Sequence, residues 1–152
     1  MTLVVETIDD LKTLGDGAYL GTSEWFEVDQ RRIDVFADAT DDHQWIHVDP
    51  ERAARGPFKG TVAHGYLTLA LIVPMWSQIL DVRNVTTKLN YGLDKVRFPA
   101  PVAVGSKIRT TAVLASVQDI PGGVQIAIDA TIEREGSDKP VCAARLLFRY
   151  LA

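Results

Sequence analysis

The stretch Leu67–Trp76, LTLALIVPMW, decides the fold, and Thr68 is its only polar residue. A helix that is apolar on every side is normally buried on every side. The sequence therefore predicts one central, buried helix, from about Ala63 to Leu80. Pro74 lies inside it and lacks the backbone N–H that an α-helix needs, so we expect Pro74 to kink the helix or to split it in two.

The sequence after this helix is typical of strands, because runs of β-branched and aromatic residues alternate with Gly and Pro turns. The last three runs are long and their connections are tight, which predicts an antiparallel meander. Such a sheet buries an apolar helix against its concave face. The predicted class is α+β, a curved antiparallel sheet wrapped around a central, largely apolar helix. The predicted strands are Lys88–Tyr91, Lys95–Phe98, Lys107–Val117, Val124–Glu135 and Val141–Tyr150.

The sequence before the central helix predicts shorter elements. Apolar residues at helical spacing indicate two helices, and an Asp-Pro pair marks the start of a third. The predicted elements are a helix at Thr7–Leu14, a turn region at Gly15–Gly21, a strand at Ser23–Val28, a helix capped by Asp29 and ending near Ala39, and a short helix from Asp49-Pro50 to Gly56-Pro57.

Composition limits the classes of function. The 152 residues carry a net charge of −4 and are 47% hydrophobic, which fits a single folded domain over residues 1–152 and disfavours nucleic-acid binding. Cys142 is the only cysteine, so we expect it in the core and the protein in the reducing cytoplasm. We see no signal peptide, and the longest apolar run is too short to span a membrane.

The chemistry gathers in Asp41–Pro50, DDHQWIHVDP. Asp42 and His47 are five positions apart in a segment that we expect to be non-helical, so a loop can bring them to one water molecule for general acid–base catalysis. The alternative is structural: Asp42 caps a turn and His47 is a hydrogen-bonded core histidine.

Two features at the start of the central helix add to this pair. The Gly65 N–H belongs to the first helical turn, where donors lack internal partners, and it can stabilise a carbonyl oxygen that gains charge during a reaction. Its alternative role is tight packing. Thr68 either hydrogen-bonds back to the helix or helps to fix the carbonyl of a ligand.

Basic residues outnumber acidic ones between Lys88 and Arg109, where Asp94 is the only carboxylate. Such a local rim can bind the phosphates of a carrier such as coenzyme A, or its charges can simply face solvent on alternating strand positions. The basic residues are Lys88, Lys95, Arg97, Lys107 and Arg109.

We predict neither a metal nor a cofactor. Five side chains could ligate a metal, but their spacing matches no common zinc motif. The sequence also lacks a nucleophile elbow and a nucleotide-binding glycine motif. The possible ligands are Asp42, His43, His47, Asp49 and His64.

Along nearly its whole length the sequence resembles the MaoC-like dehydratases, the (R)-specific enoyl-CoA hydratases with a hot-dog fold, and within them the NodN-like single-domain members. Their signature is an aromatic residue, Gly-Asp-x-Asn-Pro-aliphatic-His and then a small residue. Further likeness lies in Ala63-His64-Gly65 and in Val96–Val102 followed by Gly105. The signature positions are Phe36, Asp42, Ile46, His47 and Ala53 here.

This resemblance implies a part in fatty acid metabolism: the hydration of a trans-2-enoyl-CoA to a (3R)-hydroxyacyl-CoA, or the reverse dehydration. Asp42 and His47 would be the catalytic pair, and the Gly65 N–H would polarise the thioester carbonyl. Three positions depart from the signature: Asp41 replaces Gly, Gln44 replaces Asn and Trp45 replaces Pro. The substrate-binding residues that we predict are Gln44, Trp45, His64, Thr68, Lys95 and Arg97.

Two other functions fit a hot-dog scaffold, namely an acyl-CoA thioesterase and a non-catalytic module that binds acyl-CoA or an acyl carrier. A lone hot-dog domain leaves one sheet edge and one side of its ligand cleft open. Pairing of two copies would cover both, so we expect a homodimer with its ligand near the interface.

Overall fold

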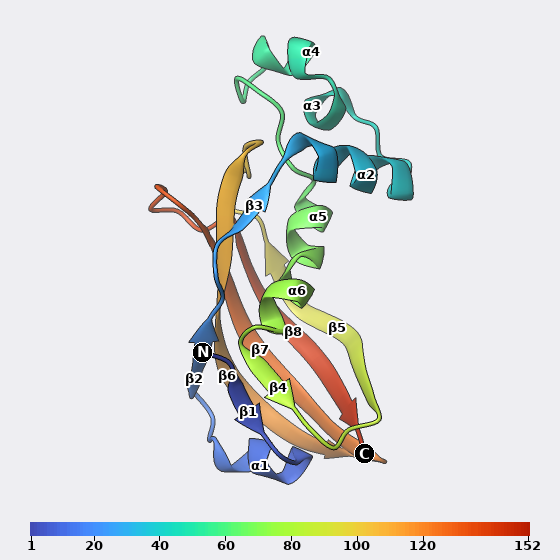
Figure 1. Ribbon diagram of the computed structural model, residues 1–152, viewed down its shortest axis with the longest axis vertical. Helices are drawn as coiled ribbons and strands as arrows, with labels where there is room; N and C mark the ends of the chain where they lie inside the picture. The colour runs from blue at the N-terminus through green and yellow to red at the C-terminus, as the bar shows by residue number, and fades with distance from the viewer.

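The computed structural model describes residues 1–152, and its centre is a curved antiparallel sheet around two short helices (Figure 1). Strands β6 (Ser106–Ile120), β7 (Gly123–Arg134) and β8 (Cys142–Leu151) form the predicted meander. β5 (Thr87–Arg97) pairs with β8, while β2 (Tyr19–Thr22) and β3 (Phe26–Val28) both pair with β6. The strand order is β2-β6-β7-β8-β5, and the expected hot-dog arrangement is confirmed.

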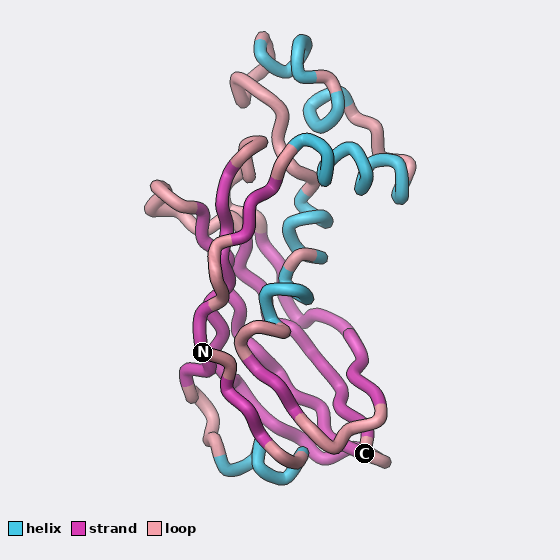
Figure 2. The backbone as a smooth tube through the Cα atoms, in the orientation of Figure 1, coloured by secondary structure: helices cyan, strands magenta, loops and turns pink.

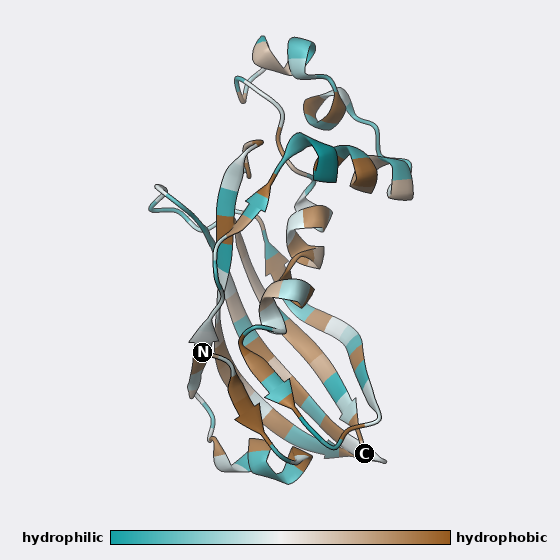
Figure 3. Ribbon diagram, viewed as in Figure 1, coloured by the Kyte–Doolittle hydropathy of each residue, from teal (hydrophilic) through white to brown (hydrophobic).

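The sheet carries its apolar residues on the face that covers the helices. Burial alternates along β8, and inward residues such as Ile126 and Ile128 of β7 are fully buried. Figure 3 shows the same alternation as brown and teal bands along the strands. Cys142 lies in this core, as predicted, and burial raises the pKa of its thiol to about 11.

Capping side chains define the helices of the N-terminal half. α1 (Ile8–Thr13) begins at Thr7, which forms a reciprocal capping box with Asp10. The side chain of Asp29 accepts a hydrogen bond at the start of α2 (Gln30–Thr40). Asp49 does the same for α4 (Pro50–Ala54), so the Asp49-Pro50 pair marks a helix start, as predicted.

The central helix is divided, as Pro74 predicts. α5 (Gly65–Ala70) and α6 (Ile72–Trp76) meet at Leu71. Pro74 has no N–H to donate to the carbonyl of Ala70, and its ring crowds that carbonyl, so α5 ends there. The helical region also ends earlier than predicted, because Leu80–Val82 forms strand β4, which pairs in parallel with β1 (Leu3–Val5).

The prediction that this helix is buried on every side is wrong. Leu67, Ile72 and Met75 are buried, but Ala70 is exposed and Val73 has 46% of its surface accessible. Both exposed residues border a hollow that Gly92 and Leu93 of β5, the last strand of the sheet, also line, so this side of the helix has no cover within the chain.

Two further predictions fail at the strands. Segments Lys88–Tyr91 and Lys95–Arg97 belong to one strand, β5, which ends before Phe98 and whose register shifts at Asn90/Gly92 and at Leu93/Lys95. Gly92 therefore lies at a bulge instead of a turn. In the predicted turn region Gly15–Gly21, the segment from Tyr19 onward forms β2.

Helices α2, α3 (Trp45–Val48) and α4 lie together beyond one end of the sheet, over the start of α5 (Figure 2). This group, residues 30–54, is called the cap below. None of the helices is both long enough and apolar enough to cross a membrane.

Candidate active site

The cap brings DDHQWIHVDP to the N-terminal end of α5 (Figure 1). α2 ends at Asp41, which has the left-handed φ of 58° and ψ of 23°. This turn reverses the chain and directs Asp42 toward α5. We predicted that this segment is non-helical, but part of it is helical, because His47 lies in the single turn α3.

His47 is buried and its ring has a fixed orientation. Its Nδ1 lies 2.6 Å from the carbonyl oxygen of Val62. A carbonyl only accepts hydrogen bonds, so Nδ1 carries the proton and Nε2 of the neutral ring keeps its lone pair. Burial lowers the pKa of His47, and nearby His64 lowers it further, while the bond to Val62 and the charge of Asp42 act in the opposite direction.

Gln30 holds the two segments that form this hydrogen bond. Its Nε2 donates to the backbone oxygen of His47 at 2.8 Å, and its Oε1 accepts from the hydroxyl of Thr61 at 2.6 Å. Thr61 is buried and directly precedes Val62, so one amide on α2 joins α3 to the segment that leads into α5.

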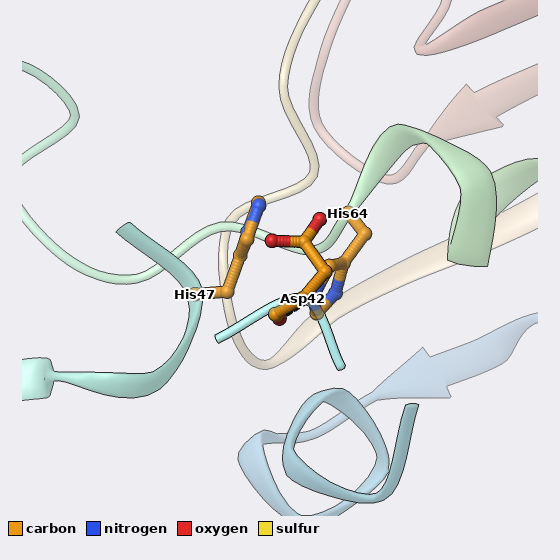
Figure 4. Close-up of side chains that lie close together, drawn as sticks. All are labelled: Asp42, His47 and His64. Carbon is orange, nitrogen blue, oxygen red and sulfur yellow. Dashed lines mark hydrogen bonds between the residues drawn. The ribbon is translucent and has the colours of Figure 1, made fainter. Parts of the chain in front are cut away.

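Asp42 is exposed, and its carboxylate points into the space beside His47 (Figure 4). One possible ligand atom from each of Asp42, His47 and His64 lies within 4.8 Å of the others. A water molecule that makes two hydrogen bonds of about 2.8 Å at a tetrahedral angle joins two acceptors about 4.6 Å apart. The spacing of this cluster therefore suits one bridging water.

His64 lies against both members of the predicted pair. Its ring stacks on the ring of His47, with centroids 3.8 Å apart and 23° between the planes. Its Nε2 donates to the backbone oxygen of Asp42 at 3.0 Å. Because nitrogen lone pairs lie in the planes of their rings, two nearly parallel imidazoles do not converge on one ion, and the cluster is poorly suited to a shared metal.

Gly65 opens α5 beside this cluster, and Phe98 covers it. A Cβ added at Gly65 would lie 3.1 Å from the ring of Phe98. A hollow of about 200 Å³ contains the cluster, and a second of about 260 Å³ shares Gly65 and Phe98 and includes Thr68. The first is lined by Asp42, His47, His64, Gly65, Tyr66 and Phe98.

Other predicted residues lie outside the hollow that contains this cluster. The hydroxyl of Thr68 donates back to the carbonyl of His64 at 3.3 Å, as one of our two alternatives expected. His43 is exposed and bonds Asp38. Trp45 packs under the Arg52 guanidinium, and it borders none of the hollows, nor does Gln44. A substrate-binding role for Gln44 and Trp45 stays a prediction.

The predicted basic rim is dispersed. Lys88 pairs with Asp81, and Arg109 pairs with Glu133. Lys95 and Arg97 instead border the largest hollow, about 500 Å³, together with the Arg145–Asp129 ion pair. β5 places this hollow on the outer face of the sheet, and Phe98 follows Arg97 directly. The charges thus lie near the site, but not in it.

Sequence reasoning missed four contributors to the site. The carbonyl of Val62 leaves no side-chain signal, and Gln30 looks like an ordinary polar residue at a helix start. Phe98 lies between a strand and Pro99-Ala-Pro101. An aromatic residue at the end of a strand was the sequence signal that could have indicated its place at the site. Tyr66 is 75% exposed and borders the same hollow.

Comparison with known proteins agrees with this geometry. A family model described as "MaoC like domain" matches residues 16–134. The chain is 51% identical over 148 residues to 3-hydroxyacyl-thioester dehydratase Z of Mycobacterium tuberculosis, with 97% of both chains covered. It is 49% identical over 131 residues to nodulation protein N of Rhizobium leguminosarum, covering 84% of this chain and 81% of that one.

A solved structure shares the fold. The unliganded R-hydratase PhaJ1 of Pseudomonas aeruginosa superposes with a TM-score of 0.72 at 22% identity, covering 91% of this chain and 83% of the other. The 51% identical relative is named as a dehydratase, which is a hydro-lyase, and the prediction of an enzyme of this class is confirmed. With the family model matching most of its length, this chain belongs to the family of MaoC-like domain proteins.

Proposed function

We propose that the protein is an (R)-specific enoyl-CoA hydratase, which adds water reversibly to a trans-2-enoyl-CoA and forms a (3R)-hydroxyacyl-CoA. The observation that carries the proposal is the lone pair of His47 Nε2, fixed by the Val62 carbonyl and placed beside the Asp42 carboxylate and the start of α5. The 51% identity to a named 3-hydroxyacyl-thioester dehydratase supports the same class of reaction.

The reaction needs one water molecule and no cofactor. His47 Nε2 and the Asp42 carboxylate each accept one hydrogen of the water. As the water oxygen bonds to C3 of the substrate, His47 takes one proton, and the resulting imidazolium delivers a proton to C2 on the same face. The thioester oxygen becomes enolate-like between these steps, and the Gly65 N–H donates to it.

The depressed pKa of His47 supports its role as the base. A buried imidazole that resists protonation is neutral near pH 7, when it must accept a proton. The opposite direction uses the same groups in reverse: His47 removes the C2 proton and returns a proton to the departing hydroxyl.

Hydration of crotonyl-CoA tests this function. Loss of the enoyl-thioester absorbance is followed, and the configuration of the product is determined by chiral analysis. Asp42→Asn and His47→Ala should each lower kcat by about 10²- to 10⁴-fold, the usual contribution of general acid–base catalysis. Asp41→Asn, a change of the neighbouring carboxylate, is the matched control and should keep most of the activity.

The same assay separates the competing functions. Release of free coenzyme A, detected with a thiol reagent, would indicate a thioesterase. Binding of crotonyl-CoA without any conversion would indicate a binding module. Normal turnover by both Asp42→Asn and His47→Ala would contradict the assigned pair.

We assign Lys95 and Arg97 to the phosphates of the substrate's carrier. Both are exposed, neither forms an ion pair, and Arg97 lies one residue from Phe98 at the site. Replacing both with Gln should raise KM for crotonyl-CoA and leave kcat nearly unchanged, because the phosphates take no part in the chemical step. A fall in kcat with constant KM would refute this assignment.

We further propose a homodimer that pairs through β5. This strand ends the sheet, so its outer N–H and C=O groups lack strand partners. Beside it lies an apolar surface formed by Ala70, Val73, Leu89 and Leu93, here called the β5-side surface. It contains two hollows between the helices and β5, and Val73 borders both. A second copy related by a two-fold axis would cover the edge and the surface together.

The single buried thiol fits our assignment to the reducing cytoplasm.

A further inference from the structure

We propose that His64 is a positioning residue, which holds Asp42 through its backbone and supports the ring of His47 from one face. The inference rests on the proposed hydratase function and deepens it. His64 is only 3% exposed, so it is enclosed by the elements that form the site.

The first contact is a hydrogen bond that fixes the loop of Asp42. The Nε2–H of His64 donates to the Asp42 carbonyl at 3.0 Å, across 22 positions of sequence. Asp42 is exposed and directly follows the left-handed Asp41, and its carboxylate accepts one long hydrogen bond, from the Gln44 N–H at 3.4 Å. The bond to His64 joins this loop to the start of the buried helix α5.

The second contact is the stack between the two imidazoles. His64 lies flat against His47 at 3.8 Å between centroids, and Phe36 packs against His64 at 4.8 Å and 59°. Phe36 therefore supports His64, and His64 supports His47. The orientation of His47 is then set by two groups: the Val62 carbonyl fixes Nδ1, and His64 limits the tilt of the ring.

The third link is covalent. His64 directly precedes Gly65, whose N–H we assign to the thioester oxygen. One residue thus connects the three groups of the proposed reaction, and a shift of His64 would displace all of them relative to each other. Misplacement by about 1 Å can cost on the order of 100-fold in rate.

The remaining nitrogen of His64 argues against a purely structural role. Nδ1 is buried without a hydrogen-bond partner within the protein. Burying an unpaired polar atom costs free energy, and a phenylalanine ring would fill the same space without that cost. A histidine here thus carries a penalty that packing alone does not require.

Two variants divide the contributions of His64. His64→Phe keeps a ring for stacking but removes the N–H donor, and His64→Gln keeps a donor at a similar reach but removes the ring. We expect kcat for crotonyl-CoA to fall about 100-fold in His64→Phe with little change in KM. His64→Gln should recover part of this loss, because it restores the bond to Asp42.

The pH profile supplies a readout that a merely structural residue would not move. The titratable groups around His47 are Asp42, His64 and the exposed Tyr66, and His64 depresses the pKa of His47. Both variants should therefore shift the acid limb of kcat/KM to higher pH. His43→Gln, a histidine change at an exposed position in the same segment, is the matched control and should leave kcat and the limb unchanged.

The outcomes are decisive in either direction. A wild-type rate and an unshifted limb in folded His64→Phe would overturn the proposal, as would equal losses in both variants without a shift. If His64→Phe fails to fold in thermal melts, the limb and the rate of His64→Gln decide alone. An inactive wild-type protein would instead refute the proposed hydratase function, so the two failures are distinguishable.

Discussion

A left-handed residue stands at the entrance to the active site. Asp41 has φ of 58°, and the resemblance identified in the sequence places a glycine at this position. Glycine adopts this conformation without steric strain, whereas other L-residues incur a cost of about 1–2 kcal/mol, which is partly relieved for aspartate. The backbone explains the usual glycine, and this chain tolerates aspartate because its short polar side chain suits the same turn.

We expect Asp41→Gly to raise the free energy of unfolding by up to about 1 kcal/mol and to retain activity. Asp41→Val should be destabilising, since a β-branched side chain disfavours positive φ. Urea denaturation of the three proteins measures both effects. Loss of turnover in a stable Asp41→Gly would instead assign a chemical role to this carboxylate.

The pKa of His47 gives a second prediction at this scale. Its folded pKa lies below the ordinary value of 6.5, chiefly because the ring is buried. As pH falls below 6.5, the unfolded chain binds this proton first, so the contribution of His47 to stability is fully present above pH 6.5 and is lost as pH falls toward the lower, folded value. The acid limb of kcat/KM should likewise lie below pH 6.5.

Thermal melts and initial rates between pH 5 and about 8 measure the two effects. Carboxylates that also titrate contribute equally to the wild type and to His47→Gln. The difference in melting temperature between these two proteins therefore isolates His47, and it should shrink as pH falls. A wild-type acid limb above pH 6.5 would contradict the role of burial at His47.

At the scale of elements, one amide joins the cap to the segment before α5. Gln30→Leu should leave the hydroxyl of Thr61 buried without its acceptor, at a cost of about 1–3 kcal/mol. It should also lower kcat, because the backbone of His47 loses its bond to Gln30. Chemical denaturation and the crotonyl-CoA assay measure the two losses.

A double-mutant cycle provides the control for this element. Thr61→Val removes the hydroxyl, so adding it to Gln30→Leu should restore part of the stability lost in the single variant. Strict additivity of the two changes would show that the bond between Gln30 and Thr61 contributes nothing to the stability of the cap.

The elements also show what the sequence could predict. Pro74 predicted the divided helix, and the long β6–β8 meander followed from its turns. By contrast, the two short runs around Gly92 suggested two strands, because a bulge and a turn share the same residue preferences. β1, β2 and β4 are three or four residues long, and their pairing depends on distant partners that local patterns do not reveal.

The sequence could predict only those site residues whose own type and spacing indicate chemistry. Asp42, His47 and Gly65 carry chemistry in their residue types and spacing, and the structure brings them together. Val62 acts through its backbone, and Gln30 acts through bonds to segments 17 and 31 positions away. Such contacts exist only once the chain has folded, so no pattern in one segment could indicate them.

At the scale of the whole molecule, the exposed side of α5 and α6 predicts the assembly. Leu93→Lys places a charge in the β5-side surface, and we expect it to convert the proposed dimer into a monomer, because an unpaired charge at an apolar interface is costly. Light scattering measures the mass. Activity should fall as well, since one side of the cleft would lose its cover.

Val35→Lys is the matched control, because Val35 is 54% exposed on α2, away from the β5-side surface. It should leave both mass and activity unchanged. A wild-type protein that scatters as a monomer at assay concentration would contradict the dimer, and the exposed surface would then belong to the folded monomer.

The order in which the ribosome makes the chain gives the divided helix a further consequence. α5 and α6 are synthesised before β6, β7 and β8, the strands that shelter them. Strand β2 must also wait, since Tyr19 pairs with Val113. The most apolar segment of the nascent chain is thus complete before its shelter, which requires translation of roughly the second half of the protein. At about 5–20 residues per second this lasts several seconds, during which chaperone binding and aggregation compete with folding.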